Sequence, residues 1–513
     1  MIWHICKKDF RLLWPWALLL AALQGAWHIF EAKHLPSGSP SFASSQLYLK
    51  SGPLIATVAV IVFVIQQDGL PGLALDWLVR PIRRSHLFLA KILFCAFVVL
   101  LPMVVFDIVE GLMTGFTLSQ ILTAALSHAL FLALCVILPL FAVAATTKGI
   151  ADFTAMALLL FLLVEMPRSL LADYFTLRPT VWSGASWIPT TAGYGIVLAG
   201  SLLVLWLQYS ARRTTWSRIL LPLFAVGGFM TDYTPWPVLM SVQSRLSPDI
   251  EASRSVAIEF DPTQPPWHES PGPFRRKSVS IPIKVSGVPP NAHLFADFVE
   301  ITVFDSDGKP VYDHGRTGVS GQGSPSSYLY SDRPVGAYVG LPLWFLIDPA
   351  KPLPGQPIRV LIDFALTLAE PEGDDATFGP TDIRIALPKQ GLCKTRLEGE
   401  FGTPPIDFDC LHAGSATDWS LVSAYDGDES KPYAQSLISF SYAPSFARLL
   451  RDPIDRTDSF INPLKMRPTA QLYQNTRFTL RNFRSIAHFR YRLEIPAIRL
   501  EDWGTVIDPE LKE

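Results

Sequence analysis

The chain has 513 residues, 49% of them hydrophobic, and a formal net charge of −2, which leaves room for two or three domains. Charge is unevenly spread: residues 1–233 hold 15 Lys and Arg against 10 Asp and Glu, and the remainder holds 28 against 35. The second part is therefore acidic, which argues against nucleic acid as a partner, because nucleic-acid binding requires a basic surface.

Long apolar segments fill the first 230 or so residues. Leu118–Thr147 and Thr180–Ala211 each lack any Asp, Glu, Lys or Arg. A helix needs about 20 apolar residues to cross a bilayer, so these segments indicate a polytopic membrane protein. The pattern predicts a bundle of six core spans plus a seventh, at residues 12–31, 48–67, 87–109, 119–146, 152–172, 188–210 and 218–236. Kinks are expected at Pro15, Pro102 and Pro139.

Basic residues set the expected orientation in the inner (cytoplasmic) membrane. If the seven spans alternate, most of the Lys and Arg side chains fall on the side of the N-terminus, which places this terminus in the cytoplasm. If the span at 218–236 crosses, the C-terminal domain is extracytoplasmic; if it does not, this domain is cytoplasmic. Tyr233 and Trp236 resemble interfacial anchors and favour crossing.

After about Thr234 the sequence pattern changes to short segments of alternating apolar and polar residues, separated by turn residues. Phe298–Phe304, a turn at Asp305–Gly308 and Pro310–Tyr312 predict a β-hairpin. Strands are also expected at 278–285, 358–368 and 490–496. This pattern is typical of sandwich folds, either one large sandwich or two small ones. The predicted domains are 1–211 (membrane helices), 212–240 (a cytoplasmic loop and the seventh span) and 241–513 (extracytoplasmic β domain).

The five cysteines divide between the two parts. Cys6, Cys95 and Cys135 lie in or beside membrane segments, where a small apolar side chain is expected to pack. Cys393 and Cys410 are the only two in the β domain and form a candidate disulfide. The alternative is two buried thiols, but a disulfide agrees with the orientation predicted from charge.

Motifs for catalysis or nucleotide binding are absent. The sequence has no G-x-x-x-x-G-K-[ST], H-E-x-x-H or G-x-S-x-G motif and no spacing typical of zinc ligands. We therefore expect that the protein is not an enzyme and binds neither a cofactor nor a metal ion. Asp107, Glu110 and Glu165 are the polar membrane residues of possible function, because charge inside a membrane segment is costly. Each lies near an outer helix end, where we expect solvation by water or pairing with Arg168. The scattered membrane histidines are expected to be packing or interfacial residues.

The loop between the second and third expected spans contains the most distinctive short motif in the sequence. It contains Asp76-Trp77-Leu-Val-Arg80-Pro81-Ile-Arg83-Arg84, and Lys91 begins the next apolar helix. With Lys7-Lys8-Asp9-Phe10-Arg11 before the first span, it resembles the membrane subunits of ABC-2-type transporters. The resemblance covers about the first 210 residues. A short helical hairpin that precedes the last core span in that family corresponds to Glu165–Trp187.

This resemblance implies a permease subunit that works as a dimer with a second, identical or homologous permease and is driven by a separate cytoplasmic ABC ATPase. It also implies that one set of loop residues couples to that ATPase: Asp76, Trp77, Arg80, Pro81, Arg83 and Arg84. The membrane helices are expected to contact lipid. The seventh span and the β domain depart from the family pattern. The alternative is a membrane-anchored binding or assembly protein whose β domain recruits a partner, for example by strand addition.

Overall fold

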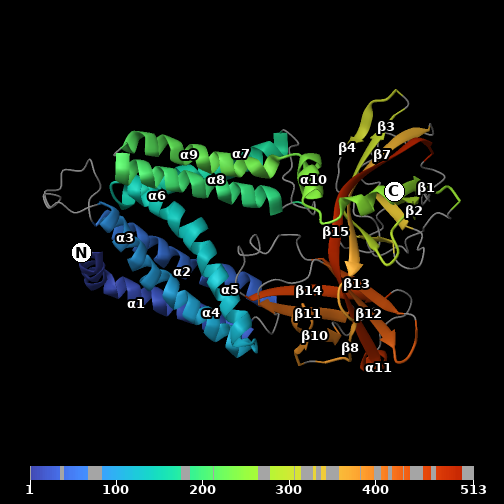
Figure 1. The fold of residues 1–513 in the computed structure, drawn as a ribbon, viewed down its shortest axis with the longest axis horizontal. Helices are drawn as coiled ribbons and strands as arrows, with labels where there is room; N and C mark the ends of the chain where they lie inside the picture. The colour runs from blue at the N-terminus through green and yellow to red at the C-terminus, as the bar shows by residue number, and fades with distance from the viewer. Residues whose placement is uncertain are drawn as a thin grey trace, which may run out of the picture.

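The computed structural model describes most of the chain as a helical part and a β part (Figure 1). The described residues are 2–34, 40–67, 84–174, 185, 187–211, 213–263, 278–305, 307–313, 327–330, 337–342, 357–381, 383–397, 406–413, 419–430, 432–439, 454–463 and 470–499.

Helices occupy all seven apolar segments of the first part. The α-helices are α1 (Ile2–His34), α2 (Pro40–Gln66), α3 (Arg84–Cys95), α4 (Leu101–Thr114), α5 (Leu118–Phe131), α6 (Leu138–Thr146), α7 (Ile150–Tyr174), α8 (Trp187–Trp206), α9 (Thr214–Met230) and α10 (Trp236–Arg245). Helix α1 is continuous from the basic residues at its start to the end of the first apolar segment. Helix α7 likewise continues through Glu165 and Pro167, so the helix has no break where the hairpin was expected to begin.

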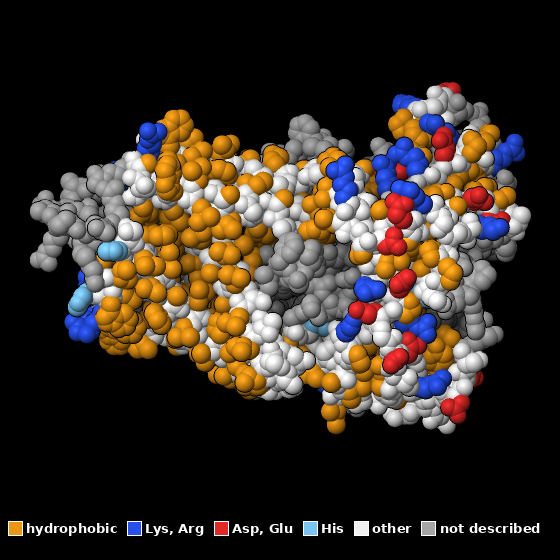
Figure 2. All heavy atoms as spheres, in the orientation of Figure 1, with side chains coloured by type: hydrophobic (Ala, Val, Ile, Leu, Met, Phe, Trp, Pro, Cys, Tyr) orange, Lys and Arg blue, Asp and Glu red, His pale blue; other side chains and the backbone are white. Residues whose placement is uncertain are grey.

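Within the described residues, four helical segments are long and apolar enough to cross a membrane: Ile2–Phe30, Ser85–Thr114, Leu118–Thr146 and Trp187–Ala211. Two shorter apolar helical segments, Ser51–Gln66 and Ile150–Val164, lie beside them. Figure 2 shows the result as a broad apolar surface over the helices, while charged side chains gather over the β domain. The prediction of helices long and apolar enough to span a membrane, followed by a mostly β C-terminal domain, is confirmed, but the described residues give four such helices and do not support six core spans.

π-Helical turns interrupt two of the long helices, at η2 (Ala96–Leu100) and η3 (Leu132–Ile137), and a third, η4 (Leu207–Ala211), forms the end of the helix that begins with α8. The first two directly precede the segments that carry Pro102 and Pro139. Proline has no N–H to donate to the preceding turn, and its ring crowds the carbonyl four residues earlier, so a widened turn relieves the conflict. At two of the three prolines where a kink is expected, the structure thus has a π turn directly before the proline-containing segment.

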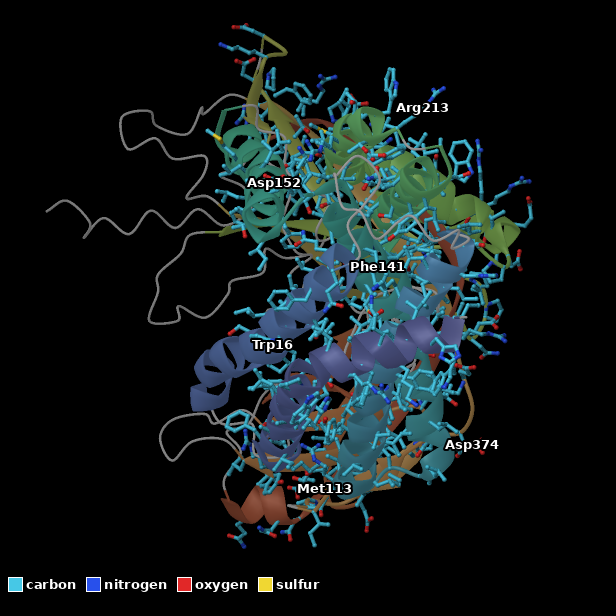
Figure 3. All side chains as sticks on the ribbon, turned by 90° about the vertical axis from the view of Figure 1, so that its left-hand side faces the viewer. Trp16, Met113, Phe141, Asp152, Arg213 and Asp374 are labelled. Carbon is cyan, nitrogen blue, oxygen red and sulfur yellow. A yellow bond between two sulfur atoms is a disulfide. The ribbon has the colours of Figure 1, made fainter. Side chains whose placement is uncertain are left out.

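Helices α8 and α9 form a close antiparallel hairpin that brings the chain to the β domain. A Cβ atom on Gly193 would lie 2.9 Å from the carbonyl oxygen of Gly228, so the backbones touch where α8 begins and α9 ends. Figure 1 shows the N-terminus and the β domain at opposite ends of the helices. Figure 3, which looks onto the end away from the β domain, shows Asp152 and Arg213 in one group of helices and Trp16 in the other.

Two 3-10 turns, η5 (Thr231–Tyr233) and η6 (Ile250–Ser255), flank α10 before the first strand. Sheet one has the order β1-β2-β6, and sheet two the order β4-β3-β7-β15-β12-β13-β14-β11-β10-β9, with β5 on β3 and β8 on β15. The strands are β1 (Ala257–Phe260), β2 (Ser278–Ser286), β3 (His293–Phe304), β4 (Pro310–Asp313), β5 (Ser327–Tyr330), β6 (Ala337–Pro342), β7 (Ile358–Pro371), β8 (Ala376–Phe378), β9 (Ile385–Leu387), β10 (Gly391–Leu397), β11 (Ile406–Ala413), β12 (Trp419–Asp426), β13 (Ala434–Ser439), β14 (Ile454–Pro463) and β15 (Thr476–Ile498), with a short helix α11 (Ala470–Gln474) before β15.

The long strand β15 belongs to two hydrophobic cores. Its first third pairs with β12 and β8, and its remainder pairs with β7, with a register shift between Ser485 and Ala487. One core lies between sheet one and the β3-β7-β15 region, and the other is enclosed by β10 to β13 and the start of β15. The β domain therefore consists of two lobes that share one strand. The predicted β3–β4 hairpin and the strands at 278–285, 358–368 and 490–496 are confirmed.

Cys393 and Cys410 form the predicted disulfide. They face each other directly on β10 and β11, with Cα atoms 4.0 Å apart, and both are buried. Because disulfides persist in oxidising compartments, the bond indicates an oxidising, extracytoplasmic environment for this domain.

Two of the apolar contacts that fix the β domain to the helices lie at the α4–α5 turn and on α10. Phe116 in the α4–α5 turn and Ile121 pack with Leu411 of β11 and Ile454 of β14. At the other contact, Trp236 and its neighbours on α10 pack against Ala365 of β7. The α4–α5 turn thus lies directly beside the strand that carries Cys410.

Candidate functional site: buried charge in the helical bundle

The predicted coupling segment lies largely outside the described residues. Asp76, Trp77, Arg80, Pro81 and Arg83 fall in the undescribed stretch 68–83, and Arg84 is the first residue of α3, with its side chain outside the description. The same holds for the side chain of Glu165, which lies within α7. These assignments stay predictions.

The segments that flank this loop are joined by a buried ion pair. Lys91 Nζ on α3 donates a hydrogen bond to Asp9 Oδ2 on α1 at 2.8 Å, and both side chains are almost completely buried. Lys8 Nζ lies 3.6 Å from the other oxygen of Asp9 and is half exposed. The basic N-terminal sequence and the lysine that follows the predicted coupling loop are therefore in contact through one carboxylate.

A second polar cluster lies at the opposite end of the same helices. It consists of His28 on α1, Asp107 and Glu110 on α4, and His128 on α5. Asp107 and Glu110 are three residues apart, which places them on one helix face. The structure contradicts the expectation that water reaches them, since their exposed fractions are 0% and 4%.

Both histidines of this cluster contact its carboxylates. His28 Nδ1 lies 2.6 Å from Glu110 Oε2, and His28 Nε2 lies 3.5 Å from Asp107 Oδ1. His128 Nδ1 lies 3.1 Å from Asp107 Oδ2. Asp107 therefore lies between two imidazoles, and His28 lies between two carboxylates. These two histidines, expected to be packing or interfacial residues, also make polar contacts with buried carboxylates.

Close helix packing brings the four residues together. A Cβ atom on Gly25 of α1 would lie 2.9 Å from the ring of Phe106, and one on Gly111 of α4 would lie 2.1 Å from Ile121 of α5. Glycine at these two positions lets α1 and α5 approach α4 on either side of the carboxylates. The ring of Phe106 also stacks on His28, with centroids 6.0 Å apart. The glycines are a local signal, but the sequence does not reveal which helices they face.

In chemical terms the cluster places two carboxylates against two imidazoles inside the bundle, and a neutral imidazole donates a hydrogen bond from one ring nitrogen and accepts with the other. Among the residues that the structure describes, no group of His, Cys, Asp or Glu has an arrangement that fits a metal ion. The cluster lies about one helical turn, or roughly 6 Å, before the α4–α5 turn that packs on the β domain.

A third polar group, missed by sequence analysis, crosses the β3-β7-β15 region. Thr367 Oγ1 donates a hydrogen bond to Asp297 Oδ2 at 2.6 Å and lies 2.8 Å from His488 Nδ1. Burial lowers the pKa of His488 from 6.5 to about 4, so the ring is neutral at pH 7. Because the hydroxyl proton of Thr367 is donated to Asp297, the neutral ring of His488 donates from Nδ1 to the oxygen of Thr367. The group joins three strands and is not a nucleophile activated by a base.

Charged residues on the same strands bind α10. Burial alone would raise the pKa of Asp363, but hydrogen bonds from Arg492 and Arg490 outweigh it, so its pKa is lowered. The guanidinium of Arg490 also lies 5.1 Å from the ring of Trp236, whose Nε1 donates to Glu300 at 2.7 Å. The start of α10 is thereby fixed to the sheet by polar as well as apolar contacts.

Comparison with known proteins gives no family for this chain: no family model matches it, and no curated protein matches it.

Proposed function

We propose that the protein is the membrane subunit of an ABC-2-type transporter, working as a dimer with a separate cytoplasmic ATPase. The observation that carries this proposal is the buried Asp9–Lys91 pair, which links α1 to the helix that follows the predicted coupling loop. A force applied by an ATPase to the loop between residues 67 and 84 would reach α1 and α3 together through this pair. The lack of a phosphate-binding loop in the sequence fits an ATPase carried by another chain.

The proposed topology has six core spans and a seventh formed by α9. In this topology the six-span core consists of the four long helical segments and of α2 and α7, whose apolar parts are shorter. Support comes from α9, which starts beside the end of α8 and returns along it to the end where the β domain lies. With the N-terminus in the cytoplasm of an inner membrane, an odd number of spans leaves the disulfide-containing domain outside.

Charge reversal in the loop tests the coupling assignment. We expect Arg80→Glu/Arg83→Glu to abolish co-purification of the ATPase from the native membrane, because cationic residues are assigned to grip acidic groups of the partner. The matched control is Arg254→Glu/Arg484→Glu, which reverses two well-exposed arginines of the β domain. Unchanged ATPase recovery with the loop variant, at normal membrane insertion, would remove the loop from the coupling role.

A binding or assembly role for the β domain is the second candidate. It is favoured by the extensive fixation of this domain to the helices, through the α4–α5 turn and through α10, which suits a scaffold that holds a partner at a set position. Such a protein would be recovered with extracytoplasmic partners and without an ATPase.

A further inference from the structure

Helix α10 lies where the helices meet the β domain (Figure 1). Trp187, the first residue of α8, donates a hydrogen bond from its indole Nε1 to Gln243 Oε1 of α10 at 2.7 Å. The same tryptophan begins one of the segments that are long and apolar enough to cross a membrane. A helix bound directly to the end of such a segment lies at the level of the bilayer surface, where the hydrocarbon core meets the lipid headgroups.

One side of α10 packs against the β domain. Trp236, Leu239 and Met240 are buried and form an apolar cluster with Ala365 of β7. Trp236, which resembled an interfacial anchor in the sequence, is thus turned toward the sheet. Any contact between α10 and lipid must therefore come from the other side of the helix.

The accessible side of α10 carries an apolar stripe. Val238, Val242 and Leu246 follow one another at a spacing of four residues, and their exposed fractions are 51%, 37% and 62%. Residues four apart share a helix face, so the three side chains lie in one row. Ser241, which is also exposed, donates its hydroxyl to the carbonyl oxygen of Val238 at 3.0 Å. This hydroxyl is therefore satisfied within the helix and does not require water.

The size and the position of the stripe favour lipid over a protein partner. Stable protein–protein interfaces take about 800 Å² and roughly 20–30 residues from each side, far more than one row of three side chains. Only residues 231–235 separate α10 from α9, whose Leu223 and Met230 are exposed apolar side chains. The stripe thus continues the broad apolar surface that covers the helices (Figure 2).

We propose that α10 is an interfacial helix, whose Val238, Val242 and Leu246 insert between the headgroups and the acyl chains of the surrounding bilayer. Helices of this kind bury their apolar side by about 5–10 Å and keep cationic side chains at the headgroups. Arg245, exposed in the last turn of α10, has the charge to bind lipid phosphate. Because the other side of α10 packs on β7, the helix holds the β domain at a fixed height above the membrane.

Photocross-linking of the full chain in phosphatidylcholine nanodiscs tests this contact. No ATPase is present, so the outcome is independent of the transporter assignment. Benzoylphenylalanine replaces Val238 or Val242 in separate variants, and mass spectrometry after illumination identifies the molecule that each variant has captured. Leu202, an exposed residue of α8, is the positive control position, and Asp428, an exposed residue in the turn after β12, is the negative control position.

We expect the Val238 and Val242 variants to form phosphatidylcholine adducts in yields similar to that of the Leu202 variant, and the Asp428 variant to form none. Both valines are exposed, so the larger side chain displaces no packed neighbour, and the second position keeps the test decisive if one variant folds poorly. Lipid adducts no more abundant than those at Asp428 would overturn the proposal. Cross-links from Val238 or Val242 to a second copy of this chain, in place of lipid, would also overturn it.

Discussion

In the helical half, charged side chains inside the bundle are buried in close contact with partners from other helices, whereas many ion pairs of the β domain lie on its surface. Asp9 and Lys91 are almost inaccessible, while Arg481 and Asp375, on β15 and the loop before β8, are each about one-third exposed. Water screens the second pair and not the first. The same interaction is therefore expected to have very different energetic weight in the two regions.

Breaking the buried pair should give the largest effect. Lys91→Met removes the partner that lies 2.8 Å from the fully buried carboxylate of Asp9, and we expect a loss of about 3–5 kcal/mol in unfolding free energy. Unfolding of purified protein in nanodiscs measures this loss. The double variant Asp9→Asn/Lys91→Met removes both charges and should recover most of it; a double variant no better than Lys91→Met would show that charge is not the cause.

Removing the disulfide tests the β domain in the same assay. Cys393→Ala/Cys410→Ala should lower the unfolding free energy of this domain by about 3 kcal/mol, because the bond restricts the unfolded chain. The control is Cys135→Ala, which changes a free, partly buried cysteine of the helical half. Equal unfolding of the oxidised protein and the double variant would contradict a stabilising role.

Acid should weaken the β domain through His488. The unfolded ring binds a proton below its ordinary pKa of 6.5, whereas the buried ring does so only below about 4. Between these values the unfolded state holds more protons, so stability is complete above pH 6.5 and decreases as the pH falls toward 4. The expected loss is about 3 kcal/mol. A pH series with wild type and His488→Asn measures it: the asparagine amide can replace Nδ1 as donor to Thr367, and its profile should be flatter. Parallel profiles would assign the acid sensitivity to other groups.

The smallest change is expected at the surface. Asp375→Asn removes the partner of Arg481, and we expect a loss below about 1 kcal/mol, reduced further by added salt. A loss close to that of Lys91→Met, measured in the same nanodiscs, would remove the contrast between buried and exposed pairs.

The positions of the helices, the β3–β4 hairpin and the disulfide were all predictable, because each depends on a local pattern or on a cysteine count. The shared strand β15 was not, since only Arg490–Pro496 of its 23 residues carried a strand signal that we identified. The polar cluster was half predictable. Asp107 and Glu110 stood out as charges in an apolar helix, but their partners are distant in sequence, with His28 lying 82 residues before Glu110. Tertiary packing alone brings those residues together and excludes water from them.

Gentle purification of the full complex from the native membrane, with mass spectrometry of its components, tests whether this chain is the membrane subunit of an ATPase-driven transporter. We expect two permease chains, either two copies of this one or this one with a homologue, together with a cytoplasmic ATPase in fixed stoichiometry. Recovery of the chain with extracytoplasmic proteins only, in every detergent tried, would contradict the transporter assignment and favour the β domain as a scaffold.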